Sequence, residues 1–144
     1  MNISHSKKLT MKAISTSIIF FLSFIFVTVQ AQKLTPTPQE IVNKRMDFYN
    51  QHNFIEFVKL YSPDVEIYTY PDKLLGTGTD NITSIFKPKF IAKSIKVEII
   101  SQMYNGNYVI NHEIVSENGI QTKYISIYEV KDGLIRSVKF VRDK

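Results

Sequence analysis

The chain has 144 residues, 44% of them hydrophobic, no cysteine and a formal net charge of +5. This length holds one domain, so two full catalytic domains are excluded. The lack of cysteine excludes a disulfide framework, thiol catalysis, thiolate zinc sites and lipid attachment through a cysteine. Lys7, Lys8 and Lys12 lie among the first 31 residues, which contain no acid, so the rest of the chain carries only +2. Such a small charge implies neither nucleic acid nor an anionic membrane surface as a partner.

Residues 1–31 have the order of a secretory signal peptide. A basic start is followed by an apolar stretch over residues 13–29 and by the small-residue ending Val29-Gln30-Ala31. We expect cleavage after Ala31 and an exported protein, periplasmic or secreted, with no stable membrane span after cleavage. The alternative is an uncleaved anchor, because the apolar stretch just reaches the lower length limit for crossing a bilayer.

The linker and the first helix follow the leader. Residues 32–38 read as a linker, and the domain is expected over residues 39–144. Thr37-Pro38-Gln39-Glu40 has the pattern of a capping box with proline at the first helical position, which predicts the start of a helix. The apolar residues of this segment fall on one face of a helical wheel: Ile41, Val42, Met46, Phe48 and Tyr49.

The next elements are a second helix and a strand. Asn53 repeats the capping pattern and opens a helix that is predicted to run to Tyr61. Residues 65–70 are β-branched and aromatic, which predicts a strand that Pro71 ends. A loop is expected over residues 71–78.

The rest of the chain predicts one more helix and then a sheet. Thr79 or Asp80 caps the third helix, which Lys87-Pro88 is expected to break. Four strand-like segments follow, at residues 95–104, 108–116, 121–130 and 134–141, separated by short turns that contain glycine. Because such short connections join antiparallel neighbours, the second half is predicted to be a meander, and the domain is of the α+β class.

Several groups of residues are characteristic of a known family: Tyr49 to Asn53, Phe57, Tyr61, Asp64 to Tyr68, Pro71, Gly78, Asn111 to Glu113 and Ile127 to Ile135. Over about residues 39–142 the chain resembles the nuclear transport factor 2-like superfamily, and within it the SnoaL-like branch, also labelled steroid delta-isomerase-like. The resemblance implies a cone, in which a curved antiparallel sheet wraps around three N-terminal helices and a largely apolar central pocket, commonly with dimerisation through the outer sheet face. Isomerases, dehydratases, polyketide cyclases and non-catalytic binders share this cone, so the fold alone does not give the function.

The chain departs from the ketosteroid isomerases of this superfamily. Those enzymes use an aspartate base just before a proline, with a tyrosine and a protonated acid as the oxyanion hole. Here Thr69 and Tyr70 precede Pro71, and neither is a carboxylate. The position of the oxyanion tyrosine falls close to Arg45, which cannot donate as a neutral acid at pH 7. Steroid isomerisation by that mechanism is therefore not expected.

His112 is the predicted catalytic residue. It alternates with Ile110 and Ile114 on the more apolar face of its strand, so we expect it to point toward the pocket or the helices, with Glu113 on the opposite face. A neutral imidazole there could exchange protons with a substrate near pH 7. The alternative is a hydrogen-bonded core histidine.

Arg45 and three tyrosines are the predicted ligand-binding residues. Arg45 lies near the centre of the apolar arc of the first helix, where its guanidinium could bind a ligand carboxylate. Alternatively, its stem covers apolar surface while its head reaches an acid or water. Tyr49, Tyr68 and Tyr128 are expected to line the pocket with hydroxyl groups, because their neighbours are apolar.

These observations predict an exported single-domain protein that binds a small, largely apolar molecule in its pocket. The pocket could also catalyse proton transfer of the isomerase or dehydratase type. The alternative is a non-catalytic binding or protein-association module of the same fold. Whether the protein is an enzyme is left open. The expected partners are a small-molecule ligand and a second copy of the chain, with no nucleic acid. No cofactor is implied, and no metal site is predicted, because the two histidines outside the leader form no pairing such as HExxH.

Overall fold

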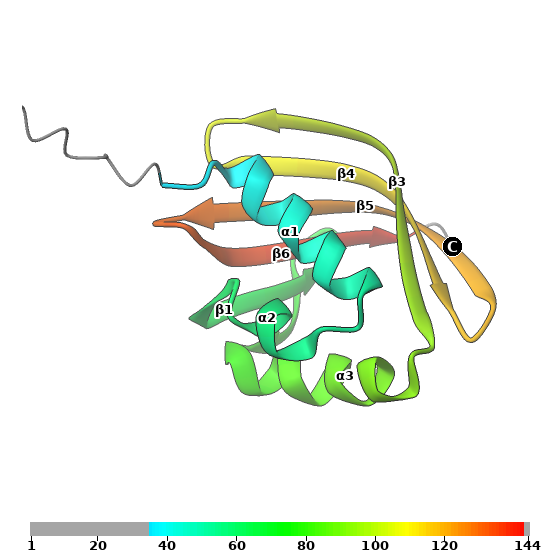
Figure 1. Cartoon of the computed structure of the whole chain (residues 1–144). Helices are drawn as coiled ribbons and strands as arrows, with labels where there is room; N and C mark the ends of the chain where they lie inside the picture. Colours follow the sequence, from blue (N-terminus) through cyan, green and yellow to red (C-terminus); the bar gives the residue numbers. More distant parts are fainter. Residues whose placement is uncertain (1–34, 143–144) are drawn as a thin grey trace, which may run out of the picture. The chain divides into compact units, whose positions relative to one another are not determined.

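The computed structural model describes residues 35–142, so the predicted signal peptide and its cleavage site lie outside the described residues. Three helices and six strands follow one another along this part of the chain: α1 (Pro38–Asn50), α2 (Phe54–Val58), β1 (Tyr61–Thr69), β2 (Lys73–Thr77), α3 (Gly78–Ala92), β3 (Ile95–Asn105), β4 (Tyr108–Glu117), β5 (Ile120–Lys131) and β6 (Leu134–Arg142). Figure 1 shows the helices on one side of a strongly curved sheet. The predicted α+β cone is confirmed.

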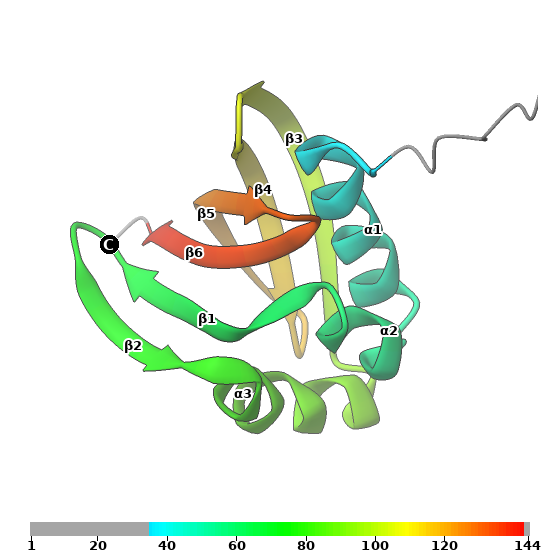
Figure 2. The ribbon, with the colours of Figure 1, turned by 90° about the vertical axis from the view of Figure 1, so that its left-hand side faces the viewer.

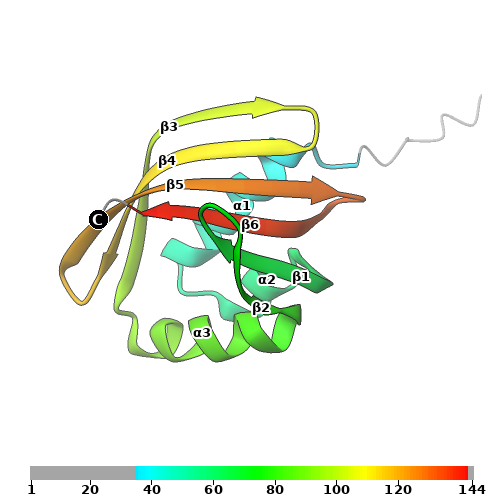
Figure 3. The same cartoon turned by 180° about the vertical axis from the view of Figure 1, so that it is seen from behind.

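The six strands form one sheet in the order β2-β1-β6-β5-β4-β3. All neighbours are antiparallel except β1 and β6, which run parallel, so the sheet is not the purely antiparallel one that was predicted. The helix α1 crosses the concave side, and α3 lies along the end formed by β1 and β2 (Figure 2). Seen from behind in Figure 3, the convex side of the sheet carries no helix.

The start of α1 follows the predicted capping box. The backbone N–H of Glu40 donates to Thr37 Oγ1 at 3.2 Å, and the backbone N–H of Thr37 donates to Glu40 Oε2 at 2.7 Å. These two bonds satisfy amide groups that a helix otherwise leaves without partners. Four of the five predicted apolar residues on this helix are buried, and Phe48 is half-buried.

Two boundaries differ from the prediction. The helix α2 ends at Val58, and β1 begins at Tyr61, where the second helix was expected to end. The helix α3 continues through Pro88 to Ala92. Proline removes one helical hydrogen bond, here to the carbonyl of Ser84, but both residues are exposed, so water can solvate that carbonyl. A proline on the solvent side therefore did not end the helix.

The short strand β2 occupies the segment that was expected to be a loop. It pairs with β1 in an irregular register and leads directly into α3. Gly76 of β2 fits closely against α3, because the Cβ atom of any other residue at this position would overlap the Asn81 side chain. A two-residue turn signal is absent here, which is why the sequence pattern favoured a loop.

The core lies between the helices and the concave side of the sheet. Its helical part is a cluster of aromatic rings in which Phe57 stands at the centre, with ring centroids 4.8 Å from Phe90, 5.3 Å from Phe86 and 5.2 Å from Tyr61. Phe57 is fully buried. This cluster packs α2 and α3 against the start of β1.

Candidate functional site

The register of β4 decides which side chains face the interior. Successive side chains of a strand point to opposite faces. Asn111 and Glu113 are 0% and 1% exposed, whereas Ile110, His112 and Ile114 are half-buried on the convex face. The predicted orientations of His112 and Glu113 are therefore wrong. The prediction placed the more apolar face inward, but the polar face is buried here because β3 and β5 supply hydrogen-bond partners for it.

The concave side holds a cavity of about 260 Å³, which we call the cone cavity. Its walls come from α1, α3 and the strands. The lining residues are Arg45, Tyr49, Thr69, Leu75, Ile85, Phe86, Lys89, Val97, Glu113, Val115, Glu117, Tyr124, Phe140 and Arg142. Apolar side chains dominate the wall, and charged groups stand at a few points on it. This is the largely apolar central pocket that the family resemblance implied.

Glu113 is the buried carboxylate of the cone cavity. Its Oε1 accepts a hydrogen bond from Ser126 Oγ at 2.6 Å and a longer one from the Tyr128 hydroxyl at 3.5 Å. Its Oε2 accepts from Asn111 Nδ2 at 3.3 Å. Gln102 in turn donates to Asn111 Oδ1 at 2.9 Å, so the carboxylate ends a chain of amides that runs across β3 and β4. Buried polar groups need such partners, and these fix the position of the carboxylate.

Arg45 places a guanidinium in the same cavity. It is 3% exposed, and its Nε donates to the Tyr61 hydroxyl at 2.6 Å. Its Nη1 donates to Met46 Sδ at 3.3 Å. The guanidinium carbon lies 5.1 to 6.0 Å from the centroids of four aromatic rings, namely Tyr49, Phe57, Phe86 and Tyr128. Aromatic faces stabilise a cation at this distance. Among the described residues, no carboxylate lies within 4.0 Å of this guanidinium.

The charge of this group and of its aromatic neighbours follows from their surroundings. Burial by itself would lower the pKa of Arg45, but Tyr128, Tyr61 and Glu113 outweigh that effect and the pKa is raised. Burial raises the pKa of Tyr49, Tyr61 and Tyr128, and the nearby guanidinium offsets only part of the increase. At pH 7 these tyrosines are therefore neutral hydrogen-bond donors next to a permanent cation.

The structure brings some of the predicted residues together and separates others. Arg45 and Tyr49 line the cone cavity, and Tyr128 is fully buried beside them against Glu113. Tyr68 does not reach the cavity, because its hydroxyl donates to Glu66 at 2.7 Å and its ring lies under the Lys139 ammonium. His112 faces the convex side, so its predicted catalytic role stays a prediction with no place in this cavity.

The residues not singled out from the sequence include Glu113 as an interior group, which lines the cavity, and also Ser126 and Tyr61, which are hydrogen-bonded to cavity-lining residues. A signal for the first two exists in the pairing of strands. Glu113 and Ser126 are buried on adjacent strands, where Ser126 stands between Ile125 and Ile127 and Glu113 follows the polar residues Asn111 and His112. Tyr61 was assigned to the end of a helix, which hid its role as the partner of Arg45.

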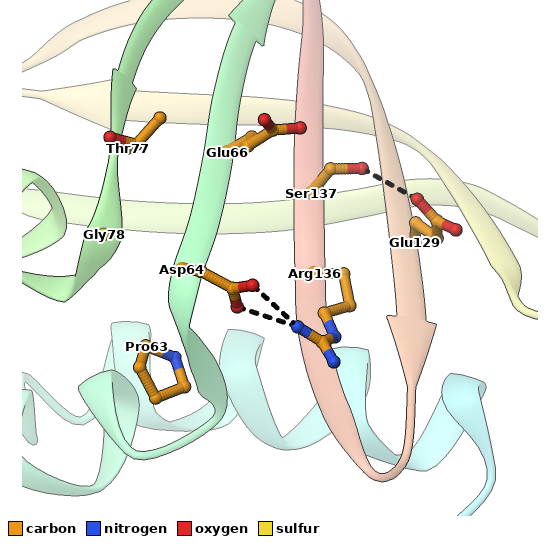
Figure 4. A pocket seen from close by; sticks show the side chains of 8 residues that line it. All are labelled: Pro63, Asp64, Glu66, Thr77, Gly78, Glu129, Arg136 and Ser137. Carbon is orange, nitrogen blue, oxygen red and sulfur yellow. Dashed lines mark hydrogen bonds and ion pairs between the residues drawn. The ribbon is translucent and has the colours of Figure 1, made fainter.

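A second hollow, which we call the outer groove, lies on the convex side between β1, β2, β5 and β6 (Figure 4). Its lining is polar: Pro63, Asp64, Glu66, Thr77, Gly78, Glu129, Arg136 and Ser137. Arg136 Nη1 donates to both carboxylate oxygens of Asp64, at 2.8 and 3.0 Å, and Ser137 donates to Glu129 at 3.3 Å. Hydrogen bonding from Ser62, together with Arg136, lowers the pKa of Asp64. Arg136 is paired with Asp64, and the other two carboxylates, Glu66 and Glu129, accept hydrogen bonds from hydroxyl groups, so the groove offers mainly polar groups that already have partners.

Neither a cluster of metal-ligating side chains nor a membrane-spanning helix occurs in residues 35–142. This part of the chain contains no group of three or more histidine, aspartate or glutamate side chains placed to hold a metal ion. Within the same residues, every helix is too short or too polar to cross a bilayer.

A family comparison agrees with this geometry. The model of the SnoaL-like domain matches residues 42–138, which run from within α1 to the middle of β6. The chain belongs to the SnoaL-like domain family. Among curated proteins, none matches this SnoaL-like protein.

Solved structures share the fold of this SnoaL-like protein at low identity. An NTF2-like protein of unknown function from Cytophaga hutchinsonii is 18% identical over 77% of this chain and 94% of that one, with a TM-score of 0.66. An LEH-like epoxide hydrolase of M. tuberculosis is 13% identical over 74% and 82%, with a TM-score of 0.62. A de novo designed protein with a curved β-sheet is 22% identical over 74% and 84%, with a TM-score of 0.59. An enzyme and a designed protein thus share one cone, so function has to be argued from the cavity.

Proposed function

We propose that this protein binds a small, largely apolar molecule in the cone cavity. The observation that carries the proposal is the combination of an apolar wall with two buried donors, Arg45 and Tyr49, at one place on it. Ligand sites in proteins have this form, in which apolar side chains supply contact area and a few polar groups fix the orientation. The cavity is smaller than the 300 Å³ or more that typically holds a drug-sized ligand, so the molecule is smaller than that.

The test uses two substitutions on neighbouring residues of β4. Val115 lines the cone cavity, whereas Ile114 is half-buried on the convex face. Val115→Phe fills the cavity, and Ile114→Phe adds the same bulk on the other side of the same strand. We expect native mass spectrometry of protein from its own cells to show a bound small molecule in the wild type and in Ile114→Phe. Val115→Phe should have lost it, and equal retention in both variants would contradict the proposal.

A proton-transfer activity is the second candidate function, and the Glu113 carboxylate in the cavity favours it. Each carboxylate oxygen has two lone pairs, and Oε2 accepts only one hydrogen bond, from Asn111. It can therefore accept a proton from a bound substrate while Arg45 and Tyr49 donate to an oxygen that gains negative charge. The LEH-like epoxide hydrolase with the same fold supports this reading only by analogy. Turnover that persists in Glu113→Gln with a folded protein would exclude this role.

The export of the protein is part of the proposal. It rests on the order of charge, apolar stretch and small residues in the leader. The mature protein would begin at Gln32. N-terminal sequencing of the extracytoplasmic form decides this point, since recovery of intact Met1 material from membranes alone would favour an uncleaved anchor.

Dimerisation through the convex sheet face completes the proposal. Ile110, Ile114, Ile125 and Ile127 face outward on β4 and β5, next to the 63% exposed Met103 of β3. Val138 and Phe140 of β6 do not belong to this face, because Val138 is fully buried and Phe140 lines the cone cavity. A twofold contact would remove the outward-facing residues from water. Sedimentation of the purified protein at micromolar concentration should show a dimer, and Ile125→Lys should shift it to a monomer.

A further inference from the structure

The hydrogen bonds of Arg45 leave one side of its guanidinium unused. Nε donates to Tyr61 and Nη1 to Met46, but among the described residues Nη2 has no hydrogen-bond partner. A buried cation needs partners, because its removal from water is costly. The aromatic rings around the guanidinium stabilise its charge. They do not accept hydrogen bonds as strong as those that a carboxylate accepts.

Nη2 is open to the cavity rather than sealed in protein. In the part of the chain that the structure describes, Asn81 Oδ1 is the single fully enclosed side-chain polar atom without a partner. Arg45 Nη2 and the Tyr49 hydroxyl also lack protein partners, so both have accessible surface, and both residues line the cone cavity. Since Arg45 and Tyr49 are only 3% and 4% exposed overall, that surface faces the cavity.

Both carboxylates of the cavity have partners. Glu113 accepts three hydrogen bonds, and Glu117 lies 2.6 Å from the Lys89 ammonium. The two buried groups of the cavity that have no protein partner among the described residues, Arg45 Nη2 and the Tyr49 hydroxyl, are therefore donors. Its lining carries three cationic side chains and two carboxylates, so one positive charge is in excess. An anion that accepts hydrogen bonds complements both properties.

We infer that the cone cavity takes a small monocarboxylate, with the carboxylate accepting hydrogen bonds from Arg45 Nη2 and the Tyr49 hydroxyl. The apolar body of the ligand lies against Ile85, Val97 and Phe140, and the volume of about 260 Å³ limits it to a short acyl chain or a single ring. This inference rests on the proposed small-molecule function and names the class of molecule. The Glu113 carboxylate in the cavity wall repels such an anion.

The experiment compares octanoate with octanamide, which have the same number of heavy atoms and differ in charge. Titration calorimetry of the purified protein should give an octanoate affinity at least about tenfold higher than that of octanamide, since a hydrogen bond to a charged group contributes more than a neutral one. Tyr49→Phe should reduce the octanoate affinity about tenfold and keep the ring in place. Tyr104→Phe is the matched control, because Tyr104 is 64% exposed and outside the cavity.

A second variant separates ligand recognition from a structural role. Glu113→Gln removes a negative charge from the cavity wall, so it should raise the ratio of octanoate affinity to octanamide affinity several-fold. Equal binding of the two compounds by the wild type would overturn the carboxylate class and leave the small-molecule function intact. If neither compound binds and no molecule copurifies, the small-molecule function fails as well.

Discussion

Arg45 of α1 and Tyr61 of β1 are joined inside the protein by a hydrogen bond of 2.6 Å from the guanidinium Nε to the phenol oxygen. Both side chains are buried, at 3% exposed each. The bond fixes the guanidinium in the middle of an aromatic cluster and so decides that its Nη2 atom, rather than Nε, faces the cone cavity.

Tyr61→Phe should lower the free energy of unfolding by about 1 to 3 kcal/mol, because it leaves a buried charged donor without its acceptor and keeps the ring. Because the chain contains no tryptophan, urea denaturation followed by far-UV circular dichroism measures the change in the free energy of unfolding. Tyr108→Phe, at a position 48% exposed, is the control and should change little. Equal stability of the two variants would show that the Arg45–Tyr61 bond contributes nothing.

Ser126→Ala should destabilise the protein by about 1 to 3 kcal/mol, because it removes the 2.6 Å hydrogen bond to the buried Glu113 carboxylate. Ser116→Ala, on the convex face of the neighbouring strand, is the comparison and should have a much smaller effect. The same urea denaturation measures both. A loss confined to Ser116→Ala would contradict the assignment of Glu113 to the interior.

The stability of the protein should decrease as the pH rises above about 10. Burial raises the pKa of Tyr49, Tyr61 and Tyr128 above the value of about 10 that the unfolded chain has. Above that pH the unfolded state releases protons that the native state keeps. The contribution of these tyrosines to the free energy of unfolding is therefore complete below the unfolded pKa and is lost as the pH rises toward the native pKa values. Ultraviolet titration at 295 nm should show fewer tyrosinates in folded than in denatured protein at about pH 11. Identical titration curves would contradict the burial of these phenols.

Pro88→Ala should raise the free energy of unfolding by about 1 to 2 kcal/mol. Alanine restores the hydrogen bond to the Ser84 carbonyl in the middle of α3 and removes the clash of the ring with the preceding turn. Lys87→Ala, next to it and also exposed, is the control. Thermal unfolding compares the two, and a lower midpoint for Pro88→Ala would mean that the proline ring makes contacts that stabilise the helix.

Local signals predicted much of the fold. The capping box at Thr37 and the glycine turns between β3, β4, β5 and β6 are fixed by neighbours in the sequence, and the structure confirms them. The family resemblance supplied the curved sheet and the central pocket. The pairing of β1 with β6 joins residues far apart in the chain, and no local pattern encodes it.

The candidate site was harder to predict than the fold. Period-two alternation showed that His112 and Glu113 face opposite ways, but it could not say which face is interior. The usual rule that the more apolar face points inward fails here, because the buried Glu113 has Ser126 and Asn111 as partners on the same face. Asn111 precedes Glu113 by two residues on the same strand, but Ser126 becomes visible as a partner only when β4 and β5 are placed side by side. Arg45 was recognised because a charge in an apolar arc is unusual on a single helix.

The position of β6 determines how late during synthesis the six-stranded sheet can be completed. It is the last of the described strands to be synthesised, yet it lies between β1 and β5 and bonds to both. Until it emerges, the hairpin of β1 and β2 has no contact with the meander of β3, β4 and β5 through the sheet. Long-range pairing of this kind delays folding. Under the proposed export, this delay would keep the polypeptide unfolded while its leader is being translocated.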